Sequence, residues 1–268
     1  MNKRVLNNKY GLAEMQENLL ITLDALDLIC RENGIHYTIH GGTILGAERN
    51  HHLIPWDDDV DIAMWRDEFE KFKSVIEARN IPDNFYLDEI TMWFPRFVMK
   101  NQNAPVYIDI LIWDYISESK IAQKLKITCL RAIQGMMKED VDYSQYGLKG
   151  KILVGITQGM GKLISTKKKL EIFHNIQTKR WLGRKKYIHR SNDSYRGCTY
   201  ILDSKYMDGY TEIELEGKNY MVNERYHEFL IMAYGENYMT PPPVKDRHPG
   251  HVKFRKSIEK KQKVGNKL

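Results

Sequence analysis

The sequence predicts a mixed α/β (α+β) fold, in which a mixed sheet is flanked by helices and a further helical region is added. Three observations support this prediction. Residues 11–115 alternate between helical and strand patterns, beginning with an amphipathic helix that ends at Gly34. Residues 121–187 have helical periodicity on both sides of a glycine-rich break. Residues 211–235 predict a hairpin that turns near Gly217 and a helix that ends at Gly235.

The remaining elements follow from the spacing of apolar residues. In the alternating part, strands are predicted over 35–40, 60–64, 95–100 and 106–114, the last of them β-rich and largely apolar. A helix is predicted over 66–80. In the helical region, apolar residues recur near every 3.6 positions over 121–138, and the same pattern returns over 167–187.

The net charge of +6, from 41 Lys and Arg against 35 Asp and Glu, is unevenly distributed along the chain. Residues 120–190 hold 17 Lys and Arg against four acids, a net of +13, while the remainder has a net of −7. Uniform basicity would favour nucleic acid as a partner, but this division does not, so no nucleic-acid partner is expected. Basic helices that also carry Ile, Leu, Met and Trp are either a solvated face over a core stripe or a surface for an anionic membrane.

The cysteines and the apolar runs bear on the compartment. Cys30, Cys129 and Cys198 are odd in number and widely spaced, which suits a reducing cytosol. No stretch reaches the roughly 18 apolar residues that cross a bilayer, and no apolar run follows the basic N-terminus. We therefore expect a cytoplasmic protein, with peripheral contact at the inner face of the membrane as a further prediction. The basic run 253–267 is expected to be a solvated tail rather than a binding arm.

The densest chemical feature is the run 54–62, IPWDDDVDI, which holds four carboxylates within five residues. Carboxylates this close repel one another unless positive charge lies among them. Because side chains alternate along a strand, Asp57, Asp59 and Asp61 share one face while the apolar residues point into the core. Asp59 and Asp61 can then converge on a hard divalent cation, with Mg²⁺ as the usual cytosolic choice and Mn²⁺ as an alternative. Asp58 has the opposite parity and is expected to finish the turn.

A further carboxylate, Asp109, lies inside the apolar strand VYIDILIW. An ionised Asp in such a strand is costly unless it is paired or bound to metal. If this strand lies beside the one that contains Asp61, Asp109 completes a three-carboxylate site with Asp59 and Asp61. Such a site could hold one or two metal ions for an in-line phosphoryl displacement. The alternative is that these acids cap turns and pair with Arg or Lys.

Gly41 and Gly42 follow a predicted strand and precede the apolar pattern TILGA. Glycines at such a place let the backbone approach phosphate oxygens, and a helix N-terminus adds favourably directed N–H dipoles. Thr43 could cap that helix or donate to phosphate, and both roles stay open.

Four more residues are candidates for substrate binding. Arg49 and Lys100 could neutralise a diphosphate or be ordinary surface cations. Trp56 could stack on a base or belong to the core. Asp57 joins them because it shares the face of the metal-binding candidates.

The block GGTILGAERNHHLIPWDDDVDIAM resembles the diagnostic block of the LicD family, bacterial phosphocholine transferases related to eukaryotic fukutin and fukutin-related protein. Three further stretches agree with the family, namely RFVMK, IDILIWD and YGENYMTPPP, so the similarity spans about residues 15–250. One of them, IDILIWD, departs from the family by lacking its usual Phe-Pro. The family pattern of Gly-Gly, Asp-x-Asp and a later strand Asp matches Gly41, Gly42, Asp59, Asp61 and Asp109.

The resemblance implies a nucleotidyltransferase-like fold. Together with the charge division, it predicts a catalytic core over 1–118, a basic helical segment over 119–190, and a C-terminal part over 191–268. The last part is expected to complete the catalytic domain with its hairpin and helix and to end in the basic tail.

The resemblance also implies an activity, namely transfer of phosphocholine or a phospho-alditol from a CDP-activated donor to a sugar hydroxyl. Acceptors in the family are teichoic acid precursors, lipopolysaccharide and other surface glycans or their lipid-linked precursors. In this mechanism Asp59, Asp61 and Asp109 hold Mg²⁺, the glycines and Thr43 cradle phosphate, and Asp109 assists deprotonation of the acceptor. Two alternatives stay open: a nucleotidyltransferase that uses an NTP such as CTP, and a non-catalytic glycan-assembly or membrane-docking protein.

Overall fold

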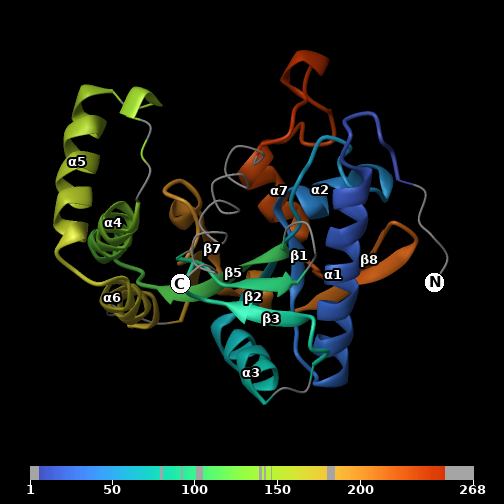
Figure 1. Ribbon diagram of the computed structural model, residues 1–268, viewed down its shortest axis with the longest axis horizontal. Coiled ribbons are helices and arrows are strands. Elements are labelled where there is room, and N and C mark those ends of the chain that lie inside the picture. Colours follow the sequence, from blue (N-terminus) through green and yellow to red (C-terminus); the bar gives the residue numbers. More distant parts are fainter. Residues whose placement is uncertain are drawn as a thin grey trace. The chain divides into compact units, whose positions relative to one another are not determined.

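The computed structural model describes residues 6–78, 81–91, 93–100, 105–138, 141, 143–145, 147–179 and 185–250. The tail predicted over 253–267 lies outside these residues. The chain divides into two compact units. Figure 1 shows their helices and strands, coloured by position in the sequence. Unit 1 comprises Met1–Asp88, Arg96–Ile110 and Met207–Leu268, and unit 2 comprises Glu89–Pro95 and Leu111–Tyr206. The C-terminal hairpin and helix therefore lie in the same unit as the clustered aspartates.

The strands of unit 1 confirm the expected sheet. They are β1 (Thr38–His40), β2 (Asp61–Trp65), β3 (Phe85–Asp88), β4 (Arg96–Met99) and the first part of β5 (Val106–Ile116). Their order is β1-β2-β5-β4-β3. β4 pairs antiparallel with β5, so that Arg96 lies opposite Asp109. The sequence did not predict β3, whose four residues are mostly half-buried and have no alternating pattern.

Helices and a hairpin complete unit 1. The helices are α1 (Ala13–Glu32), α2 (Gly41–Asn50), α3 (Arg66–Glu77) and α7 (Tyr226–Tyr234), and the hairpin pairs β8 (Tyr210–Leu215) with β9 (Lys218–Asn223). α3 buries Phe69, Phe72 and Ile76 and packs on β2 and β3. The hairpin turns at Glu216 and Gly217, both with positive φ (52° and 74°), as the favoured two-residue turn requires. The predicted hairpin and helices are thus confirmed; the helices are slightly shorter than predicted, and the hairpin is one residue longer at each end.

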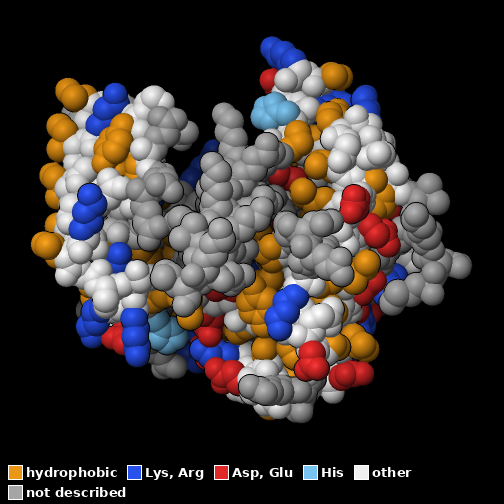
Figure 2. Space-filling view, viewed as in Figure 1, with side chains coloured by type: hydrophobic (Ala, Val, Ile, Leu, Met, Phe, Trp, Pro, Cys, Tyr) orange, Lys and Arg blue, Asp and Glu red, His pale blue; other side chains and the backbone are white. Residues whose placement is uncertain are grey.

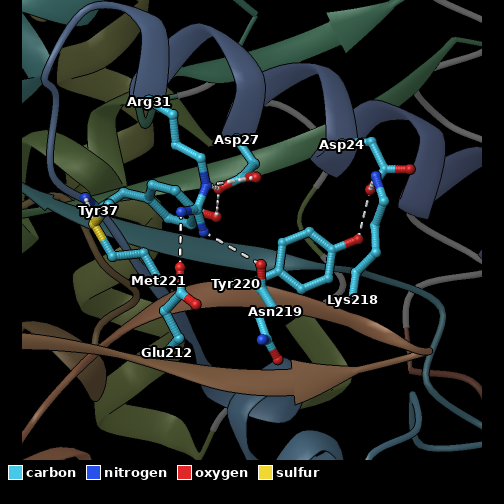
Figure 3. A network of polar contacts seen from close by, with 9 residues as sticks. All are labelled: Asp24, Asp27, Arg31, Tyr37, Glu212, Lys218, Asn219, Tyr220 and Met221. Atoms are coloured by element: carbon cyan, nitrogen blue, oxygen red, sulfur yellow. Dashed lines mark hydrogen bonds and ion pairs between the residues drawn. The ribbon is translucent and has the colours of Figure 1, made fainter.

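A polar network fixes the hairpin against α1 (Figure 3). Arg31 of α1 forms ion pairs with Asp27 on its own helix at 2.8 Å and with Glu212 of β8 at 2.7 Å. The hydroxyl of Tyr220 in β9 donates to Asp24 of α1 at 2.6 Å. β9 also contacts β1, and the backbone N–H of Asn223 donates to the Thr38 hydroxyl at 3.0 Å. The C-terminal hairpin therefore supports the strand that leads into Gly41.

Unit 2 contains the second part of β5 and the basic helices. The second part of β5 pairs with β6 (Tyr187–Arg190), which pairs with β7 (Ile201–Asp203). The helices are α4 (Lys120–Met137), α5 (Leu148–Lys162) and α6 (Thr166–Thr178). The helix predicted over 167–187 was too long, because α6 ends at Thr178 and Tyr187 already begins β6. Pairing with β5 buries Ile188 and His189 and decides their conformation, which helical periodicity alone cannot show.

The glycine-rich break expected between the basic helices was also wrong, because Leu148–Lys162 forms the helix α5. One glycine of α5 and one of α4 serve the close packing of these two helices. A Cβ at Gly161 would collide with the carbonyl of Met136, and a Cβ at Gly135 would lie 2.6 Å from the Thr157 hydroxyl. The buried ammonium of Lys169 donates to the Gly161 carbonyl at 3.2 Å. Small residues therefore let two helices approach, and that gain outweighs their weak helix propensity.

A buried histidine in unit 2 predicts acid sensitivity. Burial, with a smaller contribution from Lys126, lowers the pKa of His189 to about 3, and its Nδ1 lies 3.0 Å from the Cys198 carbonyl. Below the unfolded pKa of about 6.5, the unfolded chain binds a proton that the folded chain does not. This contribution to stability is therefore complete above about pH 6.5 and is lost as pH falls toward 3.

We expect the free energy of unfolding, measured in urea, to fall by about 2 kcal/mol from this residue between pH 7 and pH 5. His189→Asn keeps a donor for the Cys198 carbonyl but cannot titrate, so its pH dependence should be weaker by that amount. An equal pH dependence in both proteins would contradict the assignment.

Across the described residues, none of the helices combines the length and the apolar character needed to cross a bilayer.

Candidate active site

The Gly-Gly turn brings α2 against two carboxylates. β1 ends at His40, and α2 begins at Gly41, whose φ of +58° lies in the left-handed region that favours glycine. A Cβ at Gly41 would lie 2.8 Å from Oδ2 of Asp61, and a Cβ at Gly42 would collide with Oδ2 of Asp57. Both positions therefore need glycine because the carboxylates approach the helix N-terminus so closely.

Burial along the aspartate run alternates with the predicted parity, although only Asp61 of the four acids lies in a strand. Asp57, Asp59 and Asp61 are half-buried, whereas Asp58, Val60 and Ile62 are buried. The Asp58 carboxylate is fully buried and accepts a hydrogen bond from the backbone N–H of Gly250 at 3.2 Å. Asp58 thus contacts the C-terminal segment, while the other three acids lie on the accessible side of the run.

Two side chains hold this run in place. The Thr43 hydroxyl accepts a hydrogen bond from the backbone N–H of Asp61 at 3.1 Å. The amide of Gln16, buried in α1, donates to the carbonyls of Ile54 at 3.0 Å and Asp57 at 2.9 Å. Gln16 was not predicted from the sequence, since a polar residue within an amphipathic helix gives no sign that it reaches a loop about forty residues away.

Asp109 lies beside the same run, as predicted. Its backbone N–H donates to the carbonyl of Val60 at 3.3 Å, which places β5 next to the segment between Asp59 and Asp61. Its carboxylate Oδ1 accepts a hydrogen bond from Nε of the buried Arg96 at 2.8 Å. The Arg96 guanidinium in turn lies 4.0 Å from the centroid of the Tyr107 ring.

Arg96 is a second residue near this site that was not predicted from the sequence. Its only signal was the antiparallel register of the strands 95–100 and 106–114, which pairs it directly with Asp109.

The chemistry of the donor set suits a hard divalent cation, since aspartate oxygens are the ligands that Mg²⁺ takes. Among the residues that the structure describes, however, no group of three His, Cys, Asp or Glu side chains is arranged to hold a metal ion. The metal-binding roles of Asp59, Asp61 and Asp109 therefore stay predictions.

The other three substrate-binding candidates have different surroundings. Arg49, in the last turn of α2, donates to the carbonyls of Tyr238 and Thr240, and burial lowers its pKa. Trp56 is half-buried, with the Tyr10 ring edge-on at 5.8 Å and the Arg247 guanidinium 5.0 Å from its centroid. The ammonium of Lys100 donates to the carbonyl of Asp83 at 3.1 Å.

Of these three, Lys100 is the one that the structure sets apart from the carboxylates. Lys100 directly follows β4, which begins at Arg96. About four residues of extended chain, or roughly 13 Å, therefore separate Lys100 from Arg96, which pairs with Asp109. Arg49 is engaged in holding the segment after α7, and Trp56 lies directly before Asp57.

The contact between Gly42 and Asp57 gives a prediction. Gly42→Ala should lower kcat/KM of the transfer reaction that the family resemblance implies by about 100-fold, because the new methyl group displaces the Asp57 carboxylate or the start of α2. Gly159→Ala is the matched control, since a Cβ there meets nothing within 4 Å. Activity would be measured as nucleotide release. Equal activity of the two variants would show that this close approach has no part in the reaction.

Comparison with known proteins defines the class of this domain. Residues 34–141 match the family model described as "LicD/FKTN/FKRP, nucleotidyltransferase domain". This range contains the Gly-Gly turn, the aspartate run, Arg96 and Asp109. Over these residues the chain is therefore similar to the nucleotidyltransferase domain of the LicD family.

Relatives extend the similarity beyond that domain. The chain is 27% identical over 267 residues to the lipopolysaccharide cholinephosphotransferase LicD of Haemophilus influenzae, covering 91% of this chain and 97% of the relative. It is also 34% identical over 70 residues to an uncharacterized protein of Rickettsia typhi, covering 25% of this chain and 22% of that protein.

Proposed function

We propose that this protein is a LicD-like phosphotransferase that moves phosphocholine, or a similar phospho-alcohol group, from a CDP-activated donor to a hydroxyl of a cell-surface glycan. The observation that carries the proposal is the similarity to Haemophilus LicD along 97% of that protein's length. Because that relative is named for phosphocholine and lipopolysaccharide, these are the first transferred group and the first acceptor to test. A lipid-linked precursor of the glycan, presented at the inner face of the membrane, is part of the same proposal.

The residues around α2 suggest how the donor is bound. The carboxylates of Asp61 and Asp57 lie against Gly41 and Gly42 at the start of α2. With a cation bound to offset these charges, the backbone N–H groups of that helix start would bind donor phosphate oxygens. In the transfer, the acceptor oxygen forms a bond to the phosphorus of the phospho-alcohol, and the bond from that phosphorus to CMP breaks. The acceptor proton passes to a carboxylate, for which Asp109 is the candidate, and Arg96 orients that carboxylate.

We further propose Mg²⁺ as the cofactor, with Mn²⁺ as the alternative ion, held by Asp59, Asp61 and Asp109. When bound, the ion would neutralise charge on the diphosphate and on the departing CMP. Support comes from the hard oxygen donors and from the position of Asp109 beside Val60. A thermal shift with MnCl₂ that Asp59→Asn removes would support this cofactor. An identical Mn²⁺ shift in the variant would contradict it.

The test of the activity is direct. Purified protein would be incubated with MgCl₂ and, in turn, CDP-choline, CDP-ribitol and CDP-glycerol, with lipopolysaccharide as acceptor, and CMP would be followed by ³¹P NMR. We expect CMP from one donor, with CDP-choline as the first candidate. No CMP from any donor would contradict the proposal.

The family description as a nucleotidyltransferase domain favours one alternative, in which the chain joins an NTP such as CTP to a phosphorylated small molecule. The same three-aspartate chemistry would serve that reaction, but the leaving group would be pyrophosphate instead of CMP. Pyrophosphate released from CTP, together with intact CDP-choline, would identify this alternative.

A further inference from the structure

The outer face of α5 carries a stripe of large aliphatic side chains that the unit leaves uncovered. They follow one another at helical spacing: Leu148 (77% exposed), Ile152 (56%), Ile156 (57%), Met160 (50%) and Leu163 (88%), with Leu153 (61%) beside them. In Figure 2 they form the hydrophobic side chains at the left edge, where Figure 1 places α5. We call these six residues the α5 stripe.

The α5 stripe is separate from the face that α5 turns toward α4. Val154, Thr157 and Gly161 are buried, and Gly161 approaches the carbonyl of Met136. On a helix with 100° between residues, these three lie opposite the stripe. Small side chains therefore face α4 while the large aliphatic ones stay exposed, and an exposed patch of this kind marks an interaction site.

The charged residues along α5 and in its connection to α6 are of one sign. Residues 148–170 contain six lysines and no Asp or Glu. Lys151 and Lys162, both exposed, lie on the same edge of the stripe, and Lys167 is exposed at the start of α6. Lysines beside an aliphatic face can keep their ammonium groups among lipid head groups while the face enters the acyl boundary.

We propose that the α5 stripe docks this protein on an anionic phospholipid surface, with α5 lying in the plane of the interface. A lipid surface suits the stripe better than a protein partner, because the stripe has none of the Trp, Tyr or Arg residues that dominate protein interfaces. Spanning is excluded by length, since 15 residues of helix extend about 22 Å against a hydrocarbon core of about 30 Å. The proposal does not depend on which reaction the protein catalyses.

The test measures vesicle binding with no donor or acceptor present. The full-length protein would be sedimented with vesicles of phosphatidylcholine that contain about one quarter phosphatidylglycerol, and with phosphatidylcholine vesicles alone. We expect binding to the anionic vesicles at about 0.15 M NaCl and several-fold weaker binding at about 0.5 M. Ile152→Glu/Ile156→Glu should lower the partition coefficient at least about tenfold, because two carboxylates would have to enter the interface.

Leu28→Glu in α1 is the matched control, since Leu28 is 56% exposed and lies in unit 1. It should bind the anionic vesicles as the unmodified protein does. Lys151→Gln/Lys162→Gln is a second variant that keeps the stripe and should weaken binding to anionic vesicles alone. Circular dichroism would confirm that each variant is folded.

Three results would overturn the proposal. The first is equal binding of the Glu variant and the Leu28→Glu control. The second is binding that does not distinguish the two kinds of vesicle. The third is a dimer, seen by sedimentation velocity, that the Glu variant converts to a monomer while vesicles bind neither protein, since the stripe would then be an interface between copies of this chain.

Discussion

Asp61→Asn is expected to reduce the rate of the transfer reaction by about 1,000-fold or more, while the thermal midpoint changes by no more than about 2 °C. Asp61 begins β2, its carboxylate abuts Gly41, and its side chain is half-buried on the accessible side of the aspartate run. The substitution preserves shape and removes the charge. It also leaves the contact with Thr43 unchanged, because that contact uses the backbone N–H of Asp61. Loss of activity would therefore report on the carboxylate and not on the fold.

The matched control for this prediction is Asp208→Asn, an exposed aspartate in the same unit. CMP release from the productive donor would be measured for both variants at saturating MgCl₂. The control should keep full activity. Full activity in Asp61→Asn would show that its carboxylate has no catalytic role. It would also contradict the proposed metal site, which includes this carboxylate.

Much of the candidate site could be predicted because its spacing is local. The half-buried positions of Asp57, Asp59 and Asp61 have the parity that strand alternation predicts, although β2 itself begins only at Asp61. A Gly-Gly pair between a strand and a helix likewise predicts a close approach of the backbone. What approaches Gly41 and Gly42 turned out to include carboxylates of the run itself.

Residues that act across long separations could not be predicted in the same way. Gln16 reaches the loop before β2, and Arg49 donates to carbonyls about 190 residues further along the chain. Such contacts depend on how whole elements pack, which apolar periodicity does not specify. For α5 the local signal was misleading, because Gly161 weakens a helix by propensity and yet permits its close packing on α4.

Arg96→Met is expected to lower the free energy of unfolding by about 2–3 kcal/mol and to abolish most of the activity. Arg96 has a side chain only 3% exposed, and its Nε donates to Asp109, whose side chain is 17% exposed. Methionine fills a similar volume but leaves a carboxylate in a largely apolar strand without this ion pair. Removing one partner of such a pair is costly because the other keeps its desolvation penalty. The value lies below that of a fully buried pair because water still reaches Asp109.

A second variant separates stability from chemistry. Arg96→Met/Asp109→Leu replaces both charges by apolar groups, and such replacements are often close to neutral for folding. We expect urea unfolding to show that it regains at least about 1.5 kcal/mol relative to Arg96→Met. If Asp109 takes part in the reaction, the regained stability brings back no CMP release, because the carboxylate proposed to receive the acceptor proton is gone. Recovery of both stability and activity would mean that Arg96 and Asp109 hold β4 and β5 together and that catalysis depends on the aspartate run alone.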